Sequence, residues 1–131
     1  MNIENKLKTL IAKNPRTLDC GKTINNYPIA YETYGSLNEK KDNAILAFIA
    51  LTGDQHVSGI NPVTNKNGWW SHLVGSSKRI DTNKYFVICA NVIGGCMGSY
   101  GPSSLDTNTN ETLGLNFPVI TINDMVNAQY N

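Results

Sequence analysis

Two unbroken apolar runs stand out along an otherwise mixed chain. They are residues 44–51 (AILAFIAL) and residues 85–92 (YFVICANV), and both have the length of a strand. An alternating strand leaves one face to water, whereas an unbroken run indicates burial on both faces, as in a parallel sheet covered by helices. The stretch between the runs is long enough for the crossover that parallel strands require. The pattern therefore predicts an α/β fold.

Weaker patterns predict the first third of the chain. Apolar residues recur at helical spacing over residues 2–13, which predicts a short amphipathic helix that Pro15 ends. Gly21 and the Asn25–Asn26 pair are typical of turns between short strands. Residues 28–34 (PIAYETY) then suit an extended strand.

Two further helices are predicted downstream. Residues 69–74, with two tryptophans, Leu73 and Val74, predict a short helix that packs on the sheet. After a loop rich in Gly, Ser, Thr and Asn, Thr121 has the position of an N-cap with Asp124 in the first turn. No glycine cap or basic last turn follows before the chain ends. We therefore expect a truncated helix at the C-terminus.

These elements suggest the opening of an α/β domain. We expect residues 1–131 to form a partial domain, with an N-terminal extension over 1–20 that contains the short helix, and a main region over 21–131. Two buried strands and a few helices cannot cover both faces of a doubly wound sheet. The sheet should be incomplete, with an unpaired edge that invites a partner.

Composition narrows the classes of function. The 131 residues are 40% hydrophobic and 16% charged, with a net charge of +1, which gives no electrostatic case for nucleic acid or an anionic membrane. The N-terminus lacks the continuous apolar stretch of a signal peptide. Three cysteines form neither an even disulfide framework nor a CxxC metal site. We expect a cytoplasmic chain that needs no metal and no cofactor.

Few side chains suggest catalysis by themselves. His56 and His72 are the only groups that titrate near neutrality without a shift, and no serine lies in a GxSxG elbow. Cys96, in the GGCMG segment, is the best lone nucleophile, although a small residue packed in a turn is the simpler interpretation. Residues 50–54 (ALTGD) follow a buried strand directly, where α/β enzymes place active-site loops.

Four segments, in order and at matching spacing, resemble the homoserine O-acetyltransferases, acyltransferases of the α/β-hydrolase fold. The segments are YETYGSLNEKKDNAIL (31–46), ALTGDQHVSG (50–59), residues 68–104 from GWWSHLVG to GSYGPSS, and FPVITINDMV (117–126). The homoserine O-succinyltransferases are nearly as similar. The resemblance implies the N-terminal part of an α/β-hydrolase fold. It also implies an early step of methionine biosynthesis, in which an acyl group passes from acyl-CoA to the homoserine hydroxyl through an acyl-serine.

The resemblance assigns roles in one loop and leaves the nucleophile outside the chain. Leu51 corresponds to the residue whose backbone N–H helps to form the oxyanion hole, and Thr52, Gly53 and Asp54 support that loop. The family's nucleophile lies in a Gly-Gly-Ser-Met-Gly-Gly elbow on the strand after the helix that begins near Thr121, and its acid and histidine follow later. None of the three catalytic residues is therefore expected here, so we expect no activity from this chain alone.

Departures from the family pattern leave three interpretations open. Ile49 stands where the family has His, Tyr100 where it has Thr, and Asn123 where it has Arg. Such changes fit the product of a pseudogene that retains no activity. The chain can also be half of a split enzyme, completed by a separate C-terminal half that brings the catalytic residues. The third interpretation is a non-enzymatic module that binds another protein through an exposed edge.

Overall fold

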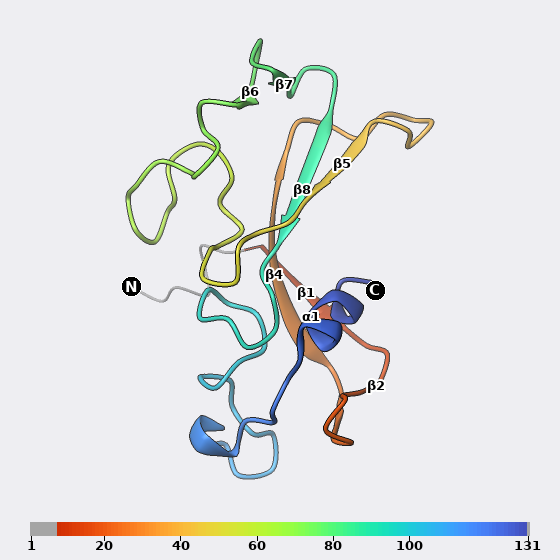
Figure 1. Ribbon diagram of the computed structural model, residues 1–131, viewed down its shortest axis with the longest axis vertical. Helices are drawn as coiled ribbons and strands as arrows, with labels where there is room; N and C mark the ends of the chain where they lie inside the picture. Colours follow the sequence, from red (N-terminus) through yellow and green to blue (C-terminus); the bar gives the residue numbers. More distant parts are fainter. Residues whose placement is uncertain (1–7, 131) are drawn as a thin grey trace. The chain divides into compact units, whose positions relative to one another are not determined.

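The computed structural model describes residues 8–130, which form two compact units (Figure 1). The first unit contains Lys8 and Tyr31–Ala90, and the second contains Thr9–Ala30 and residues 91–130. Eight strands, one 3-10 helix and one α-helix occur among the described residues: β1 (Lys8–Ala12), β2 (Arg16–Thr17), β3 (Thr23–Ile24), β4 (Tyr27–Tyr34), β5 (Ala44–Ala47), β6 (Val74–Gly75), β7 (Ile80–Asp81), β8 (Phe86–Ala90), η2 (Gly114–Asn116) and α1 (Ile122–Ala128).

The main sheet is mixed, with the strand order β1-β4-β8-β5. Strand β4 pairs antiparallel with β8, from Tyr31 opposite Ala90 to Tyr34 opposite Val87. Strand β5 pairs parallel with β8, from Ala44 opposite Phe86 to Ala47 opposite Cys89. The parallel pairing of the two apolar runs confirms the α/β prediction. Strand β5 is an edge strand of this partial sheet.

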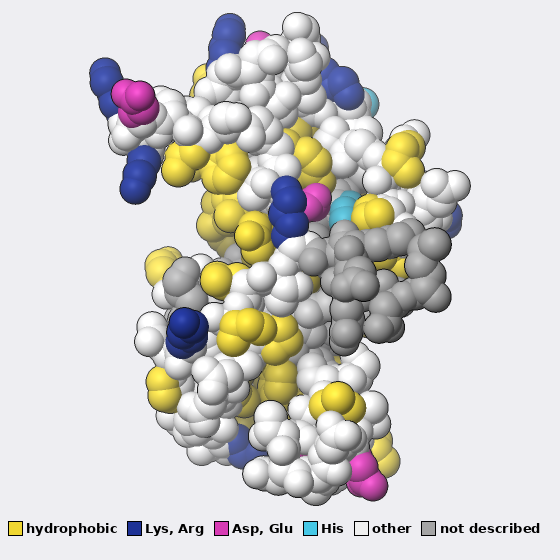
Figure 2. Space-filling view, turned by 180° about the vertical axis from the view of Figure 1, so that it is seen from behind, with side chains coloured by type: hydrophobic (Ala, Val, Ile, Leu, Met, Phe, Trp, Pro, Cys, Tyr) yellow, Lys and Arg dark blue, Asp and Glu magenta, His cyan; other side chains and the backbone are white. Residues whose placement is uncertain are grey.

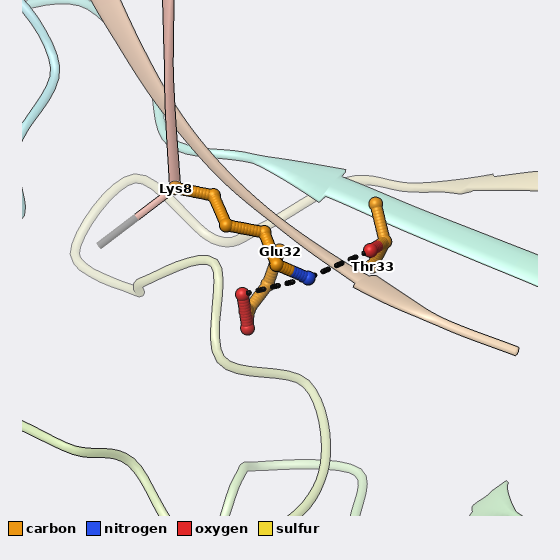
Figure 3. A network of polar contacts seen from close by, with 3 residues as sticks. All are labelled: Lys8, Glu32 and Thr33. Atoms are coloured by element: carbon orange, nitrogen blue, oxygen red, sulfur yellow. Dashed lines mark hydrogen bonds and ion pairs between the residues drawn. The ribbon is translucent and has the colours of Figure 1, made fainter. Parts of the chain in front are cut away.

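The helix predicted over residues 2–13 is wrong where the structure describes it. Lys8–Ala12 is strand β1, and residues 2–7 lie outside the described part of the chain. Lys8 Nζ donates to Thr33 Oγ1 at 2.8 Å and lies 3.4 Å from Glu32 Oε1 (Figure 3). The run of Leu10 and Ile11 suits a strand as well as a helix, so pairing with β4 decides between them.

The core of the first unit lies on one side of β5 and β8. Ala47, Val87 and Cys89 are buried there with Val57 and Val74, which belong to the connection between the two strands. The exposed fractions of Leu46 and Phe48 are 48% and 61%. The expectation of burial on both faces is therefore wrong for β5, because the described residues of this unit supply a core on one side only. Exposed hydrophobic side chains are also visible in Figure 2.

The connection between β5 and β8 contains turns rather than the helix predicted over residues 69–74. Val74 N–H donates to Trp70 O at 2.9 Å, which closes a single turn, and the chain then enters β6. Strands β6 and β7 pair parallel over two residues each. Val74 is buried as the first residue of a strand. The apolar spacing of this segment therefore does not mark one face of a helix. In the described part of the chain, no helix has the length and apolar character needed to cross a membrane.

Helix α1 begins where the sequence predicts. Thr121 Oγ1 accepts the N–H of Asp124 at 3.2 Å, and Asp124 Oδ2 accepts the N–H of Thr121 at 2.9 Å, so the two residues form a capping box. Asp124 is buried, and its Oδ1 accepts the N–H of Asp19 at 2.9 Å. The cap therefore also fastens the helix to the segment between β2 and β3. The helix ends at Ala128, whose side chain is buried.

We predict that Asp124→Ala lowers the free energy of unfolding of the second unit by about 1–3 kcal/mol, because it removes the buried carboxylate that accepts the N–H groups of Asp19 and Thr121. Chemical denaturation followed by circular dichroism measures this change. Ile122→Ala is the control in the same helix, since Ile122 is 63% exposed and should change stability by less than about 0.5 kcal/mol. Equal effects of the two variants would contradict the role of the cap.

We also predict that Cys89 resists alkylation in the native chain. Burial, with the nearby Asp54 charge as a smaller cause, raises the pKa of Cys89 to about 12, and only the thiolate reacts. Cys20 and Cys96 are exposed, so iodoacetamide at pH 8 should modify both of them and leave Cys89 intact until denaturant is added. Mass spectrometry of peptides distinguishes the three sites. Reaction of native Cys89 at the rate of Cys96 would show that this core is open.

Candidate functional site

The loop that follows β5 makes a tight turn at the position expected for the site. Ile49 packs against the core of the first unit, and the N–H of Gly53 donates to Ala50 O at 2.8 Å. Leu51 and Thr52 are thus the two central residues of a four-residue turn. Neither has a positive φ, as in a type I turn, which needs no glycine at its centre.

The turn presents free backbone donors to solvent. Within residues 8–130, the N–H groups of Leu51 and Thr52 donate to no other group. Leu51 is 63% exposed, so its side chain does not anchor the turn in the core. A fixed N–H without an internal acceptor is the kind of donor that stabilises a developing oxyanion. The geometry is compatible with the role predicted for Leu51, which stays a prediction.

Gly53 suits the turn because a side chain at this position would be crowded. Its backbone φ is not one that requires glycine. A Cβ atom at this position would lie 3.2 Å from Ala50 O and 3.5 Å from the Cβ of Ile49. Gly53 is absent from the residues with positive φ, so the conformational freedom of glycine is not what the turn uses. A larger residue would push against the carbonyl that accepts the closing hydrogen bond.

Asp54 is held on three sides. Its Oδ1 accepts the N–H of His56 at 2.8 Å, and its Oδ2 accepts Nδ2–H of Asn61 at 2.9 Å. Its backbone oxygen accepts Nε1–H of Trp69 at 3.0 Å. Asp54 therefore acts here as a hydrogen-bond acceptor that joins the turn to two later parts of the loop. The sequence places Asp54 in the loop, but it gives no sign of the Asn61 and Trp69 contacts.

The histidines do not form part of a nucleophile–base pair in the described residues. His56 is buried and its Nε2 has no hydrogen-bond partner there, while His72 is exposed. No serine hydroxyl or cysteine thiol among these residues donates to either ring. Likewise, residues 8–130 contain no group of three or more His, Cys, Asp or Glu side chains able to hold a metal ion.

The glycine-rich segment 94–104 is a packed turn in the second unit. Ser99 is buried, and its hydroxyl accepts the N–H of Ala30 and donates to Asn91 O, both at 2.9 Å. A Cβ atom on Gly95 would lie 2.3 Å from Asn91 Oδ1, and one on Gly101 would lie 2.6 Å from Gly95 O. These residues are therefore accounted for by close packing, and Ser99 has the contacts of a structural residue. Cys96 is exposed in the same turn.

The three departures from the family pattern are accommodated by their surroundings. Ile49 packs against the first unit's core. The ring of Tyr100 lies 5.2 Å from that of Phe117 and 6.3 Å from that of Tyr27, and burial raises the pKa of its hydroxyl. Asn123 Nδ2 donates to Asp19 Oδ1 at 3.1 Å. The local packing gives no sign of a defect at these positions.

Known proteins resemble the chain over most or all of its length. The homoserine O-acetyltransferase of Pelagibacter ubique is 72% identical over 131 residues, which are 100% of this chain and 35% of that protein. The homoserine O-acetyltransferase of Nitrobacter hamburgensis is 62% identical over 115 residues, 88% of this chain and 29% of that protein. The chain thus spans about a third of the length of these relatives. No family model matches it.

Solved structures give the same result for the fold. A homoserine O-acetyltransferase from Bacillus anthracis matches with a TM-score of 0.81 at 33% identity, over 94% of this chain and 34% of that one. Esterase E22 matches with a TM-score of 0.76 at 30% identity, over 94% of this chain and 36% of that one. Both have the α/β-hydrolase fold, which confirms the predicted fold class. The chain is therefore similar to the N-terminal part of the homoserine O-acetyltransferases and has the corresponding part of their α/β-hydrolase fold.

Proposed function

We propose that this chain provides the oxyanion turn of a homoserine O-acetyltransferase fold, and that its 131 residues alone catalyse no acyl transfer. The complete reaction would move an acyl group from acyl-CoA to the homoserine hydroxyl. The observation that carries the proposal is the free N–H of Leu51 in the turn that follows β5. An N–H in a preformed turn can bind the oxyanion of a tetrahedral intermediate without reorganisation. Thr52, Gly53 and Asp54 would keep it in place.

The proposed inactivity follows from the requirements of covalent catalysis. A serine hydroxyl is a weak nucleophile unless a base within hydrogen-bond reach removes its proton. Among residues 8–130, the buried Ser99 hydroxyl already donates to Asn91 O, and the buried Cys89 is held protonated by a pKa of about 12. No histidine in this range pairs with a hydroxyl or a thiol. Without a nucleophile that attacks the acyl group, no oxyanion forms, and the donor at Leu51 has no charge to stabilise.

We predict no homoserine acetylation by the purified chain. The assay combines the chain with acetyl-CoA and homoserine and follows release of the CoA thiol, with succinyl-CoA in a parallel series. The complete Pelagibacter homoserine O-acetyltransferase serves as the positive control. Homoserine-dependent thiol release by the chain alone would overturn the proposal.

A second candidate is a split enzyme, which the exposed apolar residues Leu46 and Phe48 favour. A second polypeptide that covers them would also pair the open edge of β5. Co-expression with the part of the Pelagibacter relative that this chain does not match tests the idea directly. Restored acetylation would support the split enzyme, whereas its absence would favour a gene remnant. A sharp, reversible melt of the monomer without a partner would instead favour a protein-binding module.

Leu51→Pro should abolish most activity in that complemented enzyme. Proline removes the N–H, yet it suits the second position of a type I turn, so the turn itself is kept. Loss of one oxyanion donor should lower kcat by about 10²–10³-fold. Leu51→Ala retains the N–H and should stay close to the unsubstituted chain. Similar kcat values for the two variants would show that the Leu51 N–H binds no oxyanion.

The proposal also includes where the chain is located and how far its domain extends. We place the chain in the cytoplasm, with its three cysteines as free thiols, and we treat residues 1–131 as one partial domain with an extension over 1–20. The exclusion of nucleic acid and membrane as partners rests on the net charge of +1. Acyl-CoA and homoserine are the substrates that the relatives' name suggests.

A further inference from the structure

Asn61 forms an unusually complete set of hydrogen bonds for a loop residue. It is buried, with an exposed fraction of 3%. Its Oδ1 accepts the N–H groups of Val63 and Thr64 at 2.8 and 3.1 Å. Its backbone N–H donates to Lys66 O at 2.8 Å, and its backbone oxygen accepts the N–H of Asn65 at 2.9 Å. The side chain of Asn61 is therefore fixed by the 61–66 turn.

The amide group of this fixed side chain donates a hydrogen bond toward the proposed oxyanion turn, residues 50–53. Asn61 Nδ2–H donates to Oδ2 of Asp54 at 2.9 Å, and Asp54 directly follows Gly53, which closes the turn. A hydrogen bond to a carboxylate is stronger than one between neutral groups. Asp54 thus links the side chain of Asn61 to the residue that closes the turn.

The backbone around Gly68 packs closely against that of residues 58 and 59, and this packing supports the contact between Asn61 and Asp54. Trp69 Nε1–H donates to the backbone oxygen of Asp54 at 3.0 Å. Gly68, which precedes Trp69, lies very close to the backbone of residues 56–58. A Cβ atom at Gly68 would be 2.5 Å from Ser58 N. Gly68 N–H also donates to Gly59 O at 2.8 Å. The loop is thus closed behind Asp54, which limits the ways in which Asp54 can move.

We propose that Asn61 is a positioning residue, which fixes the Leu51 oxyanion turn through its hydrogen bond to Asp54. The functional part of this inference rests on the proposed function of the turn. Without the Asn61 amide, Oδ2 of Asp54 loses its donor, and the turn keeps only the contacts made through His56 N–H and Trp69. The peptide of Leu51 would then sample orientations that do not face an oxyanion.

Amide hydrogen exchange of the full chain, measured by NMR, tests the proposal at the turn itself. The probe is Gly53 N–H, and Val87 N–H in β8 reports on the core of the same unit. Asn61→Ala should accelerate exchange at Gly53 by about 10- to 100-fold, the equivalent of one charge-assisted hydrogen bond. Exchange at Val87 should change far less. Unchanged exchange at Gly53, or equal acceleration at both probes, would overturn the proposal.

Asn61→Asp adds a signature that a general loss of structure would not produce. Two carboxylates at this distance repel each other when both are ionised, so the pair holds a proton more tightly than a single carboxyl group does. At pH 7.5, repulsion should accelerate Gly53 exchange; at pH 5, a shared proton restores an O–H···O bond and should slow exchange again, after correction for intrinsic rates. Cys89 near Asp54 stays protonated throughout, since its pKa is about 12. Loss of protection at both pH values would contradict the proposal.

Two controls separate this inference from the proposed function. The wild-type chain at both pH values shows how Gly53 exchange depends on pH without the substitution. Asn38→Asp changes an exposed Asn–Asp pair, in which Asn38 Nδ2 donates to Asp42 Oδ1 at 2.7 Å, and it should leave the exchange of Gly53 N–H unchanged.

If Asn61→Ala accelerates exchange at Gly53 while Leu51→Pro does not affect the complemented enzyme, the positioning role stands and the oxyanion role fails. If Leu51→Pro abolishes activity while Gly53 exchange is unaffected by Asn61→Ala, only the positioning role fails.

Discussion

Parallel pairing of β5 with β8 is the constraint on which the rest of this structure depends. The pairing ends with Ala47 opposite Cys89, and both residues are buried in the core of the first unit. The chain turns directly after Ile49, whose side chain still packs on that core. The place of the Leu51 turn is therefore set by sheet register on one side and by the contacts of Asp54 on the other.

A turn built in this way can be rigid although its central residues are exposed. The side chain of Leu51 is 63% exposed, so its peptide is held mainly by neighbours in sequence that are themselves anchored. This separation of support from function is useful at an active site, because the donor must stay free for the substrate while its position stays fixed. Asp54, Asn61 and Trp69 would provide the support, and the Leu51 N–H would provide the chemistry.

Local rules predicted the elements whose signals lie within a few residues. The N-cap at Thr121, with Asp124 in the first turn, is predicted by local spacing, and the two apolar runs predict β5 and β8. Strand β1 was not readable, because residues 8–12 fit a helix equally well until β4 offers a partner. The contact between Asp54 and Asn61 was also beyond the sequence, since nothing in the spacing of an aspartate and an asparagine indicates that one fixes the other. The family resemblance supplied the role of Leu51, which no periodicity would have suggested.

Acyl transfer by this family's route requires a covalent intermediate, so trapping with labelled acetyl-CoA addresses the central claim most directly. The purified chain would be incubated with isotopically labelled acetyl-CoA, with and without homoserine, and its intact mass and peptides recorded. The account predicts no acetylated residue whose label passes to homoserine. A serine or cysteine of this chain that accepts the acetyl group and loses it when homoserine is added would contradict the account.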